Sequence, residues 1–392
     1  MPPQAPSART LLATRFVEAQ RWLFADALPF WASSGTDWSG WGFWEQFDPY
    51  GQRIEAVPRR TRVVARQIFS FMAAGRMGWD GDWRAVVDHG ANALFGPCLR
   101  PDGLVVSSCD PSGRPLKADF DFYDHSFALF ALAQLGQLAA YCDRAEAAAL
   151  AMLDAMEARF AHPVAGFAED DRHGVPLRAN PHMHLLEACL AQAALPGASP
   201  RWRDWSDRIV ALAQSHFIQP DTGALHEFFD WQWRPMPDAS GRLVEPGHQF
   251  EWSWLLRTWN SGAGDAAVEA TAARLCEIGE THGVNPHGIT IDELWDDFAV
   301  RAATARTWPQ TERLKACLIA AELAGEAQRR ASWEAKATQA LDAFQPFFAT
   351  QVSGLWHDRL DGDGVPIIAA APASSLYHIV CALEYCDHYL IK

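Results

Sequence analysis

Histidines and other polar residues recur at the starts of apolar, helix-like segments of this sequence. The stretch RANPHMHLLEA places His182 and His184 ahead of a leucine-rich run. Two residues apart, these imidazoles point to different faces of a helix, so they cannot form the i, i+4 pair of a helical zinc site. Asn180 followed by Pro181 is typical of an N-cap and a first helical residue. We therefore expect His184 to face a binding site, His182 to cap or pack, and no metal to be bound.

Matching polar clusters open five other apolar segments. The interval from Arg66 to Tyr123 is 57 residues, from His184 to His248 it is 64, and from Glu312 to His378 it is 66. A lone helical histidine is usually a core residue, but recurrence in register favours a functional role. The residues expected to converge on one pocket are Arg66, Tyr123, Asn180, His184, His248, Glu251, Trp308, Glu312 and His378.

A repeat in the turns explains how residues so far apart could meet. Six hairpin-like segments begin with a glycine, and these glycines recur every 57 to 66 residues, at positions 40, 103, 166, 223, 288 and 354. Before each hairpin lies an amphipathic helical pattern, and after it a helical pattern that is apolar on nearly all sides and hence buried on two sides. The sequence predicts one domain, residues 1–392, folded as an (α/α)6 barrel of about twelve helices with hairpins at one rim. An irregular all-helical protein or an open solenoid is the alternative.

The composition excludes several classes of partner. Acidic residues outnumber basic ones 48 to 33, giving a formal charge of −15, so neither nucleic acid nor an anionic membrane is expected. The eight cysteines include no CxxC pair, no secretory signal is evident at the N-terminus, and no segment has the length of a membrane span. We expect a cytoplasmic protein whose partner is a small molecule, and the family resemblance described below implies a monosaccharide. The sequence is compatible with a homodimer.

Two histidines in one pocket suit proton transfer at carbon. Isomerising a 2-hydroxy aldehyde requires a base for the C2 proton, and imidazole has an ordinary pKa of about 6.5. Arg66 and Asn180 could stabilise the oxyanion that develops, although Arg66 could instead pair with Glu18. Glu251, three residues after His248, could orient that histidine and favour its charged form. Trp308 fits a stacking wall for a sugar ring, with a core role as the alternative.

The motifs YDHSF, RANPHMHLLEA, PGHQFEW, WPQTERLKA and LYHIV occur in this order and together resemble the N-acylglucosamine 2-epimerase superfamily over most of the chain. The resemblance implies an (α/α)6 barrel that epimerises or isomerises sugars without a metal or other cofactor. It implies that His378 moves the carbon-bound proton and that His248 opens the sugar ring. By position it also implies sugar binding by Arg66, Tyr123, Asn180, His184, Glu251, Trp308 and Glu312.

The NPHMH form of the third motif resembles the mannose isomerase branch, so we expect interconversion of D-mannose and D-fructose through an enediol. The alternatives are 2-epimerisation of N-acetylglucosamine or cellobiose, a sugar-binding protein without activity, and an inverting glycoside hydrolase. The hydrolase would need two carboxylates, with candidates at Glu169, Asp170, Glu251 and Asp296.

Anionic sugars are disfavoured by the sequence. It has no glycine-rich phosphate loop, and the predicted ring contains one arginine, with Arg301, Arg306 and Arg359 as further candidates near the rim. For a sulfonated sugar, Arg242 is the one nearby candidate before the PGH motif.

Overall fold

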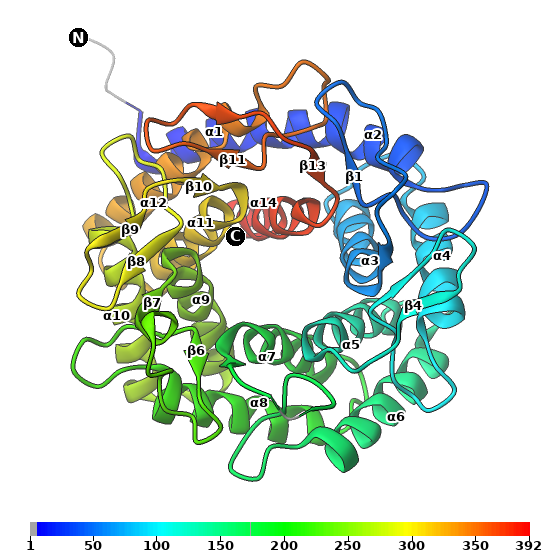
Figure 1. Cartoon of the computed structure of the whole chain (residues 1–392). Helices are drawn as coiled ribbons and strands as arrows, with labels where there is room; N and C mark the ends of the chain where they lie inside the picture. Colours follow the sequence, from blue (N-terminus) through cyan, green and yellow to red (C-terminus); the bar gives the residue numbers. More distant parts are fainter. Residues whose placement is uncertain (1–5, 173) are drawn as a thin grey trace.

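Two concentric rings of helices make up the computed structural model, which describes residues 6–172 and 174–392 (Figure 1). Within these residues the inner ring consists of α3 (Thr61–Arg76), α5 (Phe122–Gly136), α7 (Ala179–Ala193), α9 (Pro246–Ala263), α11 (Thr307–Leu323) and α14 (Ser375–Ile391). The outer ring consists of α1 (Ala8–Trp22), α4 (Trp83–Ala93), α6 (Cys142–Phe160), α8 (Arg201–Leu212), α10 (Ala266–His282) and α12 (Ala327–Asp342). Two short helices, α2 (Leu28–Phe30) and α13 (Gln345–Phe348), follow the outer helices α1 and α12. The connections also contain π-helical turns at Leu23–Ala27, Trp31–Gly35, Leu94–Cys98 and Ala213–Phe217 and a 3-10 turn at Ala239–Arg242.

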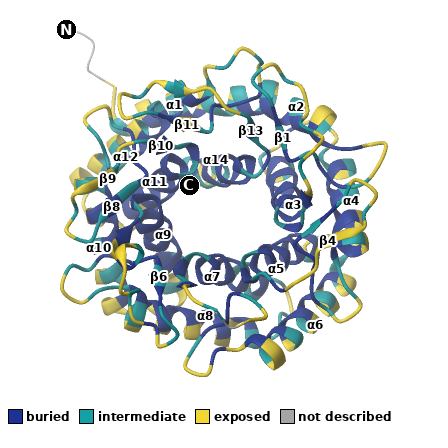
Figure 2. Cartoon of the chain, in the orientation of Figure 1, coloured by how far each residue is buried: buried dark blue, intermediate teal, exposed yellow. Residues whose placement is uncertain are grey.

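The hydrophobic pattern of each helix determines its ring. Helix α5 is buried along almost its whole length, because one side faces the lumen and the other packs on the outer ring. Helix α8 buries Trp202, Trp205 and Ile209 and exposes the charged residues between them. Figure 2 shows this difference as a buried inner ring inside an outer ring with exposed outer faces.

The inner ring is closed. Each inner helix packs on the next in chain order, and α14 packs on α3. Strand β1 (Gln46–Phe47) also pairs with β13 (Ala371–Pro372), joining the first and last connections of the chain. The prediction of an (α/α)6 barrel is confirmed, and the open solenoid is excluded.

Short strands gather at the end of the barrel where the inner helices begin, the end facing the viewer in Figure 1. The strand that leads into an inner helix pairs with a strand of the next connection, as in β2–β3, β5–β6, β7–β8, β10–β11 and β13–β1. The remaining bounds are β2 (Arg59–Arg60), β3 (Ser108–Cys109), β4 (Pro115–Lys117), β5 (Leu177–Arg178), β6 (Phe228–Phe229), β7 (Leu243–Val244), β8 (Glu293–Trp295), β9 (Val300–Ala302), β10 (Ala305–Arg306), β11 (Arg359–Leu360) and β12 (Pro366–Ile367). These pairings fix the start of each inner helix relative to its neighbour.

Side chains on four inner helices also hold the hairpins in place. Nε2 of His182 accepts the Phe167 N–H at 3.1 Å, while Nδ1 donates to the Arg178 carbonyl at 2.9 Å. Burial lowers the pKa of His182 to about 3, so it remains a neutral structural group. The same position carries His125, Gln249 and Gln310, which bind the backbone of Val105, Leu225 and Thr290. The expectation that His182 packs rather than reacts is confirmed.

Two local predictions are wrong. Helix α7 begins at Ala179 with Arg178 as its N-cap residue, so Asn180 lies in the first turn and is not the cap. In the first hairpin Gly42, not Gly40, takes the positive φ found at the other five leading glycines. Among the described residues, no helix has the length and apolar character needed to cross a membrane.

The His182 hydrogen bonds predict a specific role for Gly166. A Cβ on Gly166 would lie 2.3 Å from Nε2 of His182, and Gly166 has a φ of +73°. Gly197 has the same φ of +73° but no atom within 4 Å of such a Cβ. Alanine at either site lowers the free energy of unfolding by about 1–2 kcal/mol because the backbone is left-handed there. Gly166→Ala lowers it by a further amount of about 1–3 kcal/mol because the added methyl group overpacks the site. Urea unfolding of the two variants, followed by circular dichroism, measures the difference, and equal losses would contradict the role given to His182.

Candidate active site

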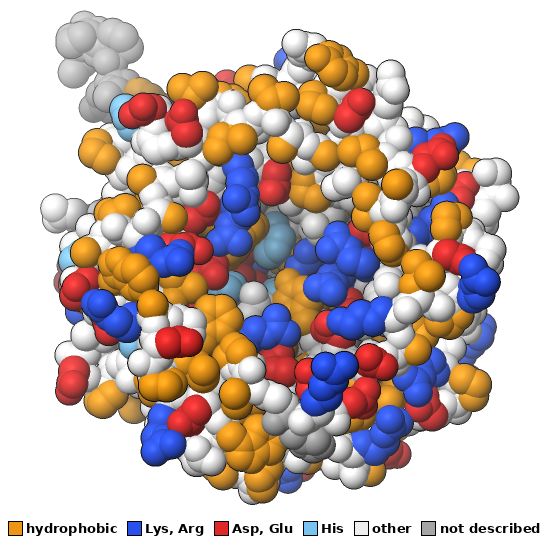
Figure 3. All heavy atoms as spheres, viewed as in Figure 1, with side chains coloured by type: hydrophobic (Ala, Val, Ile, Leu, Met, Phe, Trp, Pro, Cys, Tyr) orange, Lys and Arg blue, Asp and Glu red, His pale blue; other side chains and the backbone are white. Residues whose placement is uncertain are grey.

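A cavity of about 360 Å³ opens at the strand end of the barrel. Figure 3 shows it as a central hollow with histidine at depth and basic and acidic side chains around the mouth. Eight of the nine residues predicted to converge line it: Arg66, Tyr123, Asn180, His184, His248, Glu251, Trp308 and His378. The ninth, Glu312, is fully buried and contacts His378. A cavity of this size is in the range of small-molecule sites.

His378, on α14, is held by a buried carboxylate on α11. Its Nδ1 lies 2.9 Å from Oε1 of Glu312, and Nζ of the fully buried Lys315 lies 2.7 Å from Oε2 of the same carboxylate. Burial alone would raise the pKa of Glu312, but Lys315 and His378 outweigh it and lower the pKa to about 2. Burial lowers the pKa of His378 to about 4 against the attraction of Glu312. At neutral pH His378 is therefore uncharged, with Nδ1–H donating to Glu312 and a lone pair on Nε2.

His248, on α9, has the opposite charge state. Its Nδ1 lies 2.9 Å from Oε2 of Glu227, and Oε2 of Glu245 is 3.9 Å away. Burial would lower the pKa of His248, but these two carboxylates outweigh it and raise the pKa to about 9. His248 is therefore an imidazolium at neutral pH. Environments that separate two pKa values in this way identify an acid and a base.

Asn180 completes the surroundings of His248. Its side-chain nitrogen is 3.2 Å from Nε2 of His248, and its Oδ1 is buried without a hydrogen-bond partner among the described residues. A carboxamide can present either its oxygen or its N–H at the same place. Asn180 can thus accept from the charged imidazole and donate to the neutral one.

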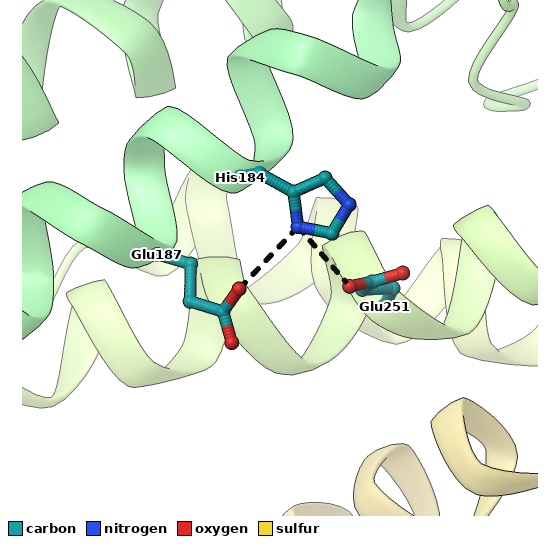
Figure 4. A group of neighbouring side chains, drawn as sticks. All are labelled: His184, Glu187 and Glu251. Carbon is teal, nitrogen blue, oxygen red and sulfur yellow. Dashed lines mark hydrogen bonds and ion pairs between the residues drawn. The ribbon is translucent and has the colours of Figure 1, made fainter. Parts of the chain in front are cut away.

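Glu227, not Glu251, is the hydrogen-bond partner of His248. Glu251 does help to raise the pKa of His248, as predicted, but less than Glu227 and Glu245 do. Glu251 instead approaches His184, whose Nδ1 is 3.9 Å from Glu251 Oε1 and 3.4 Å from Glu187 Oε2 (Figure 4). Burial and the charge of Glu312 raise the pKa of Glu251 well above its usual value. Both of its oxygens lack a hydrogen-bond partner within the described residues. The raised pKa favours the protonated form of Glu251, which can donate a hydrogen bond into the cavity.

A repeated ion pair at the barrel mouth explains why Glu227 was missed. The N-cap residues of α3, α7 and α11 are arginines, and each bonds a hairpin carboxylate through its backbone N–H and its guanidinium: Arg60 with Glu45, Arg178 with Glu169 and Arg306 with Asp292. The N-cap of α9 is Glu245. A carboxylate there repels Glu227 instead of pairing with it, and Glu227 bonds to His248. The sequence signal was a carboxylate three or four residues after the glycine in five of the six hairpins, counting from Gly42 in the first; the hairpin of Gly103 has none.

Arg66 and Trp308 form the walls between the histidines. Nη2 of Arg66 donates to the Tyr123 hydroxyl at 2.7 Å, so Arg66 does not pair with Glu18, which binds Arg15 on the outer ring. The ring centroid of Trp308 is 4.9 Å from that of His248 and 5.9 Å from that of His378. Its ring also approaches Gly247, where an added Cβ would lie 2.4 Å away. Trp308 thus contacts both imidazoles and lines the cavity, as expected for a stacking wall.

Three groups of histidine and carboxylate atoms have spacings within 4.8 Å that a cation could share. They are His184 with Glu187 and Glu251, Glu227 with Glu245 and His248, and Glu251 with Glu312 and His378. In the third group Lys315 already supplies a positive charge to Glu312. The hydroxyl of Tyr377 likewise donates to Glu187. Among the described residues, Glu187, Glu227 and Glu312 bond to neighbouring side chains, whereas the two oxygens of Glu251 have no hydrogen-bond partner.

The other candidates from the sequence divide into those that lie apart from this cavity and those that line it. Of the proposed hydrolase carboxylates, Glu169 is paired with Arg178 and Asp296 with Arg242, and neither lines the cavity. Arg242 is therefore not placed to bind a sulfonate. Arg301 pairs with Glu293, whereas Arg60, Arg306 and Arg359 do line the cavity. The sequence predicted one arginine, Arg66, at this cavity, whereas these three further arginines also line it.

A second cavity, of about 400 Å³, lies toward the other ends of the inner helices. Its lining is largely apolar and includes Phe130, Leu190, Trp254 and Tyr385. It has neither of the paired histidines, so the chemistry belongs to the cavity at the strand end.

Lys315 has a predicted structural effect that can be tested without substrate. Lys315→Met would leave Glu312 charged and buried without its cation, which typically costs about 3–5 kcal/mol. We expect Glu312→Gln combined with Lys315→Met to recover most of that loss, because the unpaired charge is gone. Lys336→Met, which removes a half-buried ammonium from Glu280, should cost less than about 1 kcal/mol. Chemical unfolding of the four proteins gives these values, and a mild effect of Lys315→Met would contradict the pairing.

Comparison with known proteins identifies the family of the chain and agrees with this fold. The sequence model of the N-acylglucosamine 2-epimerase family matches residues 42–382. A protein of Rhizobium meliloti (strain 1021) named mannose-6-phosphate isomerase is 42% identical over 373 residues, covering 93% of this chain and 95% of that protein. A D-mannose isomerase of Thermobifida fusca is 28% identical, with 74% of each chain covered.

The fold is shared with a solved cellobiose 2-epimerase from Bacillus thermoamylovorans B4167, at a TM-score of 0.85 and 18% identity. The match covers 96% of this chain and 100% of that one. At this identity the likeness concerns the fold alone. Taken with the sequence match over most of its length, the chain belongs to the N-acylglucosamine 2-epimerase family and is an isomerase or epimerase.

Proposed function

We propose that the chain interconverts an aldohexose of mannose configuration and the corresponding 2-ketose, D-mannose and D-fructose in the simplest case. The observation that carries the proposal is the pairing of one charged and one uncharged imidazole at a single cavity. His248 has a pKa of about 9 and His378 a pKa of about 4, so acid and base are both ready at neutral pH.

In the proposed reaction His248 first donates its proton to the ring oxygen as the C1–O5 bond breaks, and the O1 hydroxyl gives its proton back to His248, so that the pyranose opens to the free aldehyde. Nε2 of His378 then removes the proton from C2, and the electron pair of that bond forms the C1–C2 double bond as O1 becomes negative. The imidazolium of His378 returns the proton to C1. His248 carries the proton from O2 to O1, leaving a carbonyl at C2. Each proton lost from one atom is returned to another, so the step is an isomerisation.

Groups around the two histidines suit the enediolate that forms on the way. The Nε–H of Arg66 is buried without a partner among the described residues, so it is free to donate to an oxygen of the substrate. Neutral Glu251 and the carboxamide of Asn180 also line the cavity. Donors already oriented toward a developing oxyanion usually provide the largest share of catalysis.

The names of the relatives support an aldose–ketose outcome. The Rhizobium protein and the Thermobifida protein are both named isomerases of a mannose sugar, and they differ in whether that sugar carries phosphate. The alternative outcome is 2-epimerisation, in which His248 would return the proton to the opposite face of C2. Fructose as the product of mannose indicates isomerisation, and glucose as the product indicates epimerisation.

The proposal predicts the behaviour of histidine variants in heavy water. With D-mannose in D2O, the wild-type protein should form fructose, and any deuterium in the product should be at C1 or C2 by NMR. His378→Gln and His248→Gln should each lower kcat by about 10²–10⁴-fold, the usual contribution of a general acid or base. His287→Gln, at an exposed loop, is the matched control and should retain full activity. Near-normal turnover by either pocket variant would remove that histidine from the mechanism.

The two pKa values predict the pH dependence of kcat/KM, which reports the free enzyme. Activity should fall below about pH 4, where His378 becomes protonated and loses its lone pair, because its pKa is about 4. It should fall again above about pH 9, where His248 loses the proton it donates, because its pKa is about 9. Glu227→Gln removes the nearest negative charge and should move the alkaline limb to lower pH. An alkaline limb unchanged in Glu227→Gln would show that another group controls it.

A further inference from the structure

Two arginines face each other across neighbouring strands at the cavity mouth. In the antiparallel pair β10–β11, Ala305 is opposite Leu360 and Arg306 is opposite Arg359. Ala305 and Leu360 are buried in a small apolar cluster. Because side chains alternate along a strand, the two arginines share the other face of the pair, and both line the cavity.

Like charges directly opposite each other on a sheet are destabilising. Arg306 is offset by two carboxylates, with Nε 3.0 Å from Asp292 and Nη2 3.0 Å from Glu245. Arg359 is exposed and forms no ion pair or side-chain hydrogen bond within residues 6–172 and 174–392. The adjacent Asp358 hydrogen-bonds instead to the Ser375 hydroxyl at 3.1 Å. Burial raises the pKa of Asp358, and the charges of Arg359 and Arg306 oppose that rise. Even so, Arg359 has no carboxylate within ion-pair distance among the described residues, so one guanidinium remains without an ion pair beside a second one at the rim of the cavity.

From this arrangement we infer that Arg359, with Arg306 beside it, binds a phosphate ester on the C6 end of the sugar. This inference rests on the proposed function, because it places C1 and C2 at the histidines. The histidines are buried in the cavity and Arg359 is at its exposed rim, so the opposite end of an opened hexose points toward Arg359. Guanidinium forks match phosphate oxygens in pairs, which makes arginine the usual ligand for this group.

Phosphate suits this position better than a carboxylate at C6. A phosphate ester extends one bond beyond the O6 oxygen, toward the exposed rim, and it carries up to two negative charges that can meet both guanidiniums. The arginine pair acts on substrate selection and takes no part in the proton transfers. The substrate class is therefore an aldohexose 6-phosphate, with mannose 6-phosphate and fructose 6-phosphate as the substrate and product.

The test compares kcat/KM for mannose and for mannose 6-phosphate in wild type and Arg359→Gln. We expect wild type to favour mannose 6-phosphate at least about tenfold, and Arg359→Gln to lower the ratio of the two constants by about 10- to 100-fold, the usual effect of losing a hydrogen bond between charged groups. The control is Arg301→Gln, since Arg301 is an exposed rim arginine that pairs with Glu293 and does not line the cavity. It should leave the ratio unchanged.

Three outcomes would overturn the inference: a preference for mannose, an equal loss with both sugars in Arg359→Gln, or the same change of ratio in Arg301→Gln. Turnover of mannose without turnover of the phosphate ester would overturn the phosphate site and leave the proposed isomerisation intact. If neither sugar reacts, the proposed function fails. Thermal shift with mannose 6-phosphate then decides the site separately, because it should raise Tm in wild type and much less in Arg359→Gln.

Discussion

His378 and His248 each bond to a buried carboxylate, and the sign of the charge next to that carboxylate helps to determine whether the histidine is neutral or protonated. Burial lowers the pKa of His378, and Glu312 opposes this only in part, because its negative charge is compensated by the ammonium of Lys315 beside it, so His378 remains neutral. Glu227 has Glu245 in its neighbourhood, and the excess negative charge retains a proton on His248. Two nearly identical histidine–glutamate pairs thus become a base and an acid. In a low-dielectric lumen such neighbours act strongly, because little solvent screens them.

The same repeat that builds the barrel creates this difference. Arginines at three inner-helix N-caps bond to the hairpin carboxylates. These ion pairs stabilise the mouth of the barrel, and their carboxylates do not bond to a histidine of the cavity. At the N-cap of α9, the fourth inner helix, the residue is Glu245 instead of arginine, and the hairpin carboxylate Glu227 becomes the partner of His248. One exchange of charge within a repeated structural motif therefore turns a stabilising group into one that tunes an acid. The motif needs no change of backbone for this.

Whether the sequence predicts a residue of the site depends on what fixes the position of its side chain. The lumen positions could be predicted because the start of an inner helix faces the axis in every repeat, whatever the side chain. Glu227 could not, since its direction depends on the residue at the next helix N-cap. Lys315 is in the middle of an apolar helix, where the hydrophobic pattern predicts a core residue. Its role appears only in the structure, where Nζ lies between the carboxylate of Glu312 and the ring of Trp254, whose centroid is 3.9 Å away. The N-cap of α7 was missed by two residues, because Asn-Pro chemistry competes there with the Arg178 ion pair.

Ring closure has a consequence for biosynthesis. His378, the proposed base, belongs to α14, the last inner helix in chain order, and β13 just before it pairs with β1 near the start of the chain. A polypeptide emerging from the ribosome can assemble the first five inner helices while one wall of the lumen is still missing. Such a nascent barrel exposes ionisable side chains that have no partner until α14 docks. In the proposed mechanism the pair of histidines is complete only after α14 has docked, so a chain that lacks this last helix lacks His378 at the cavity.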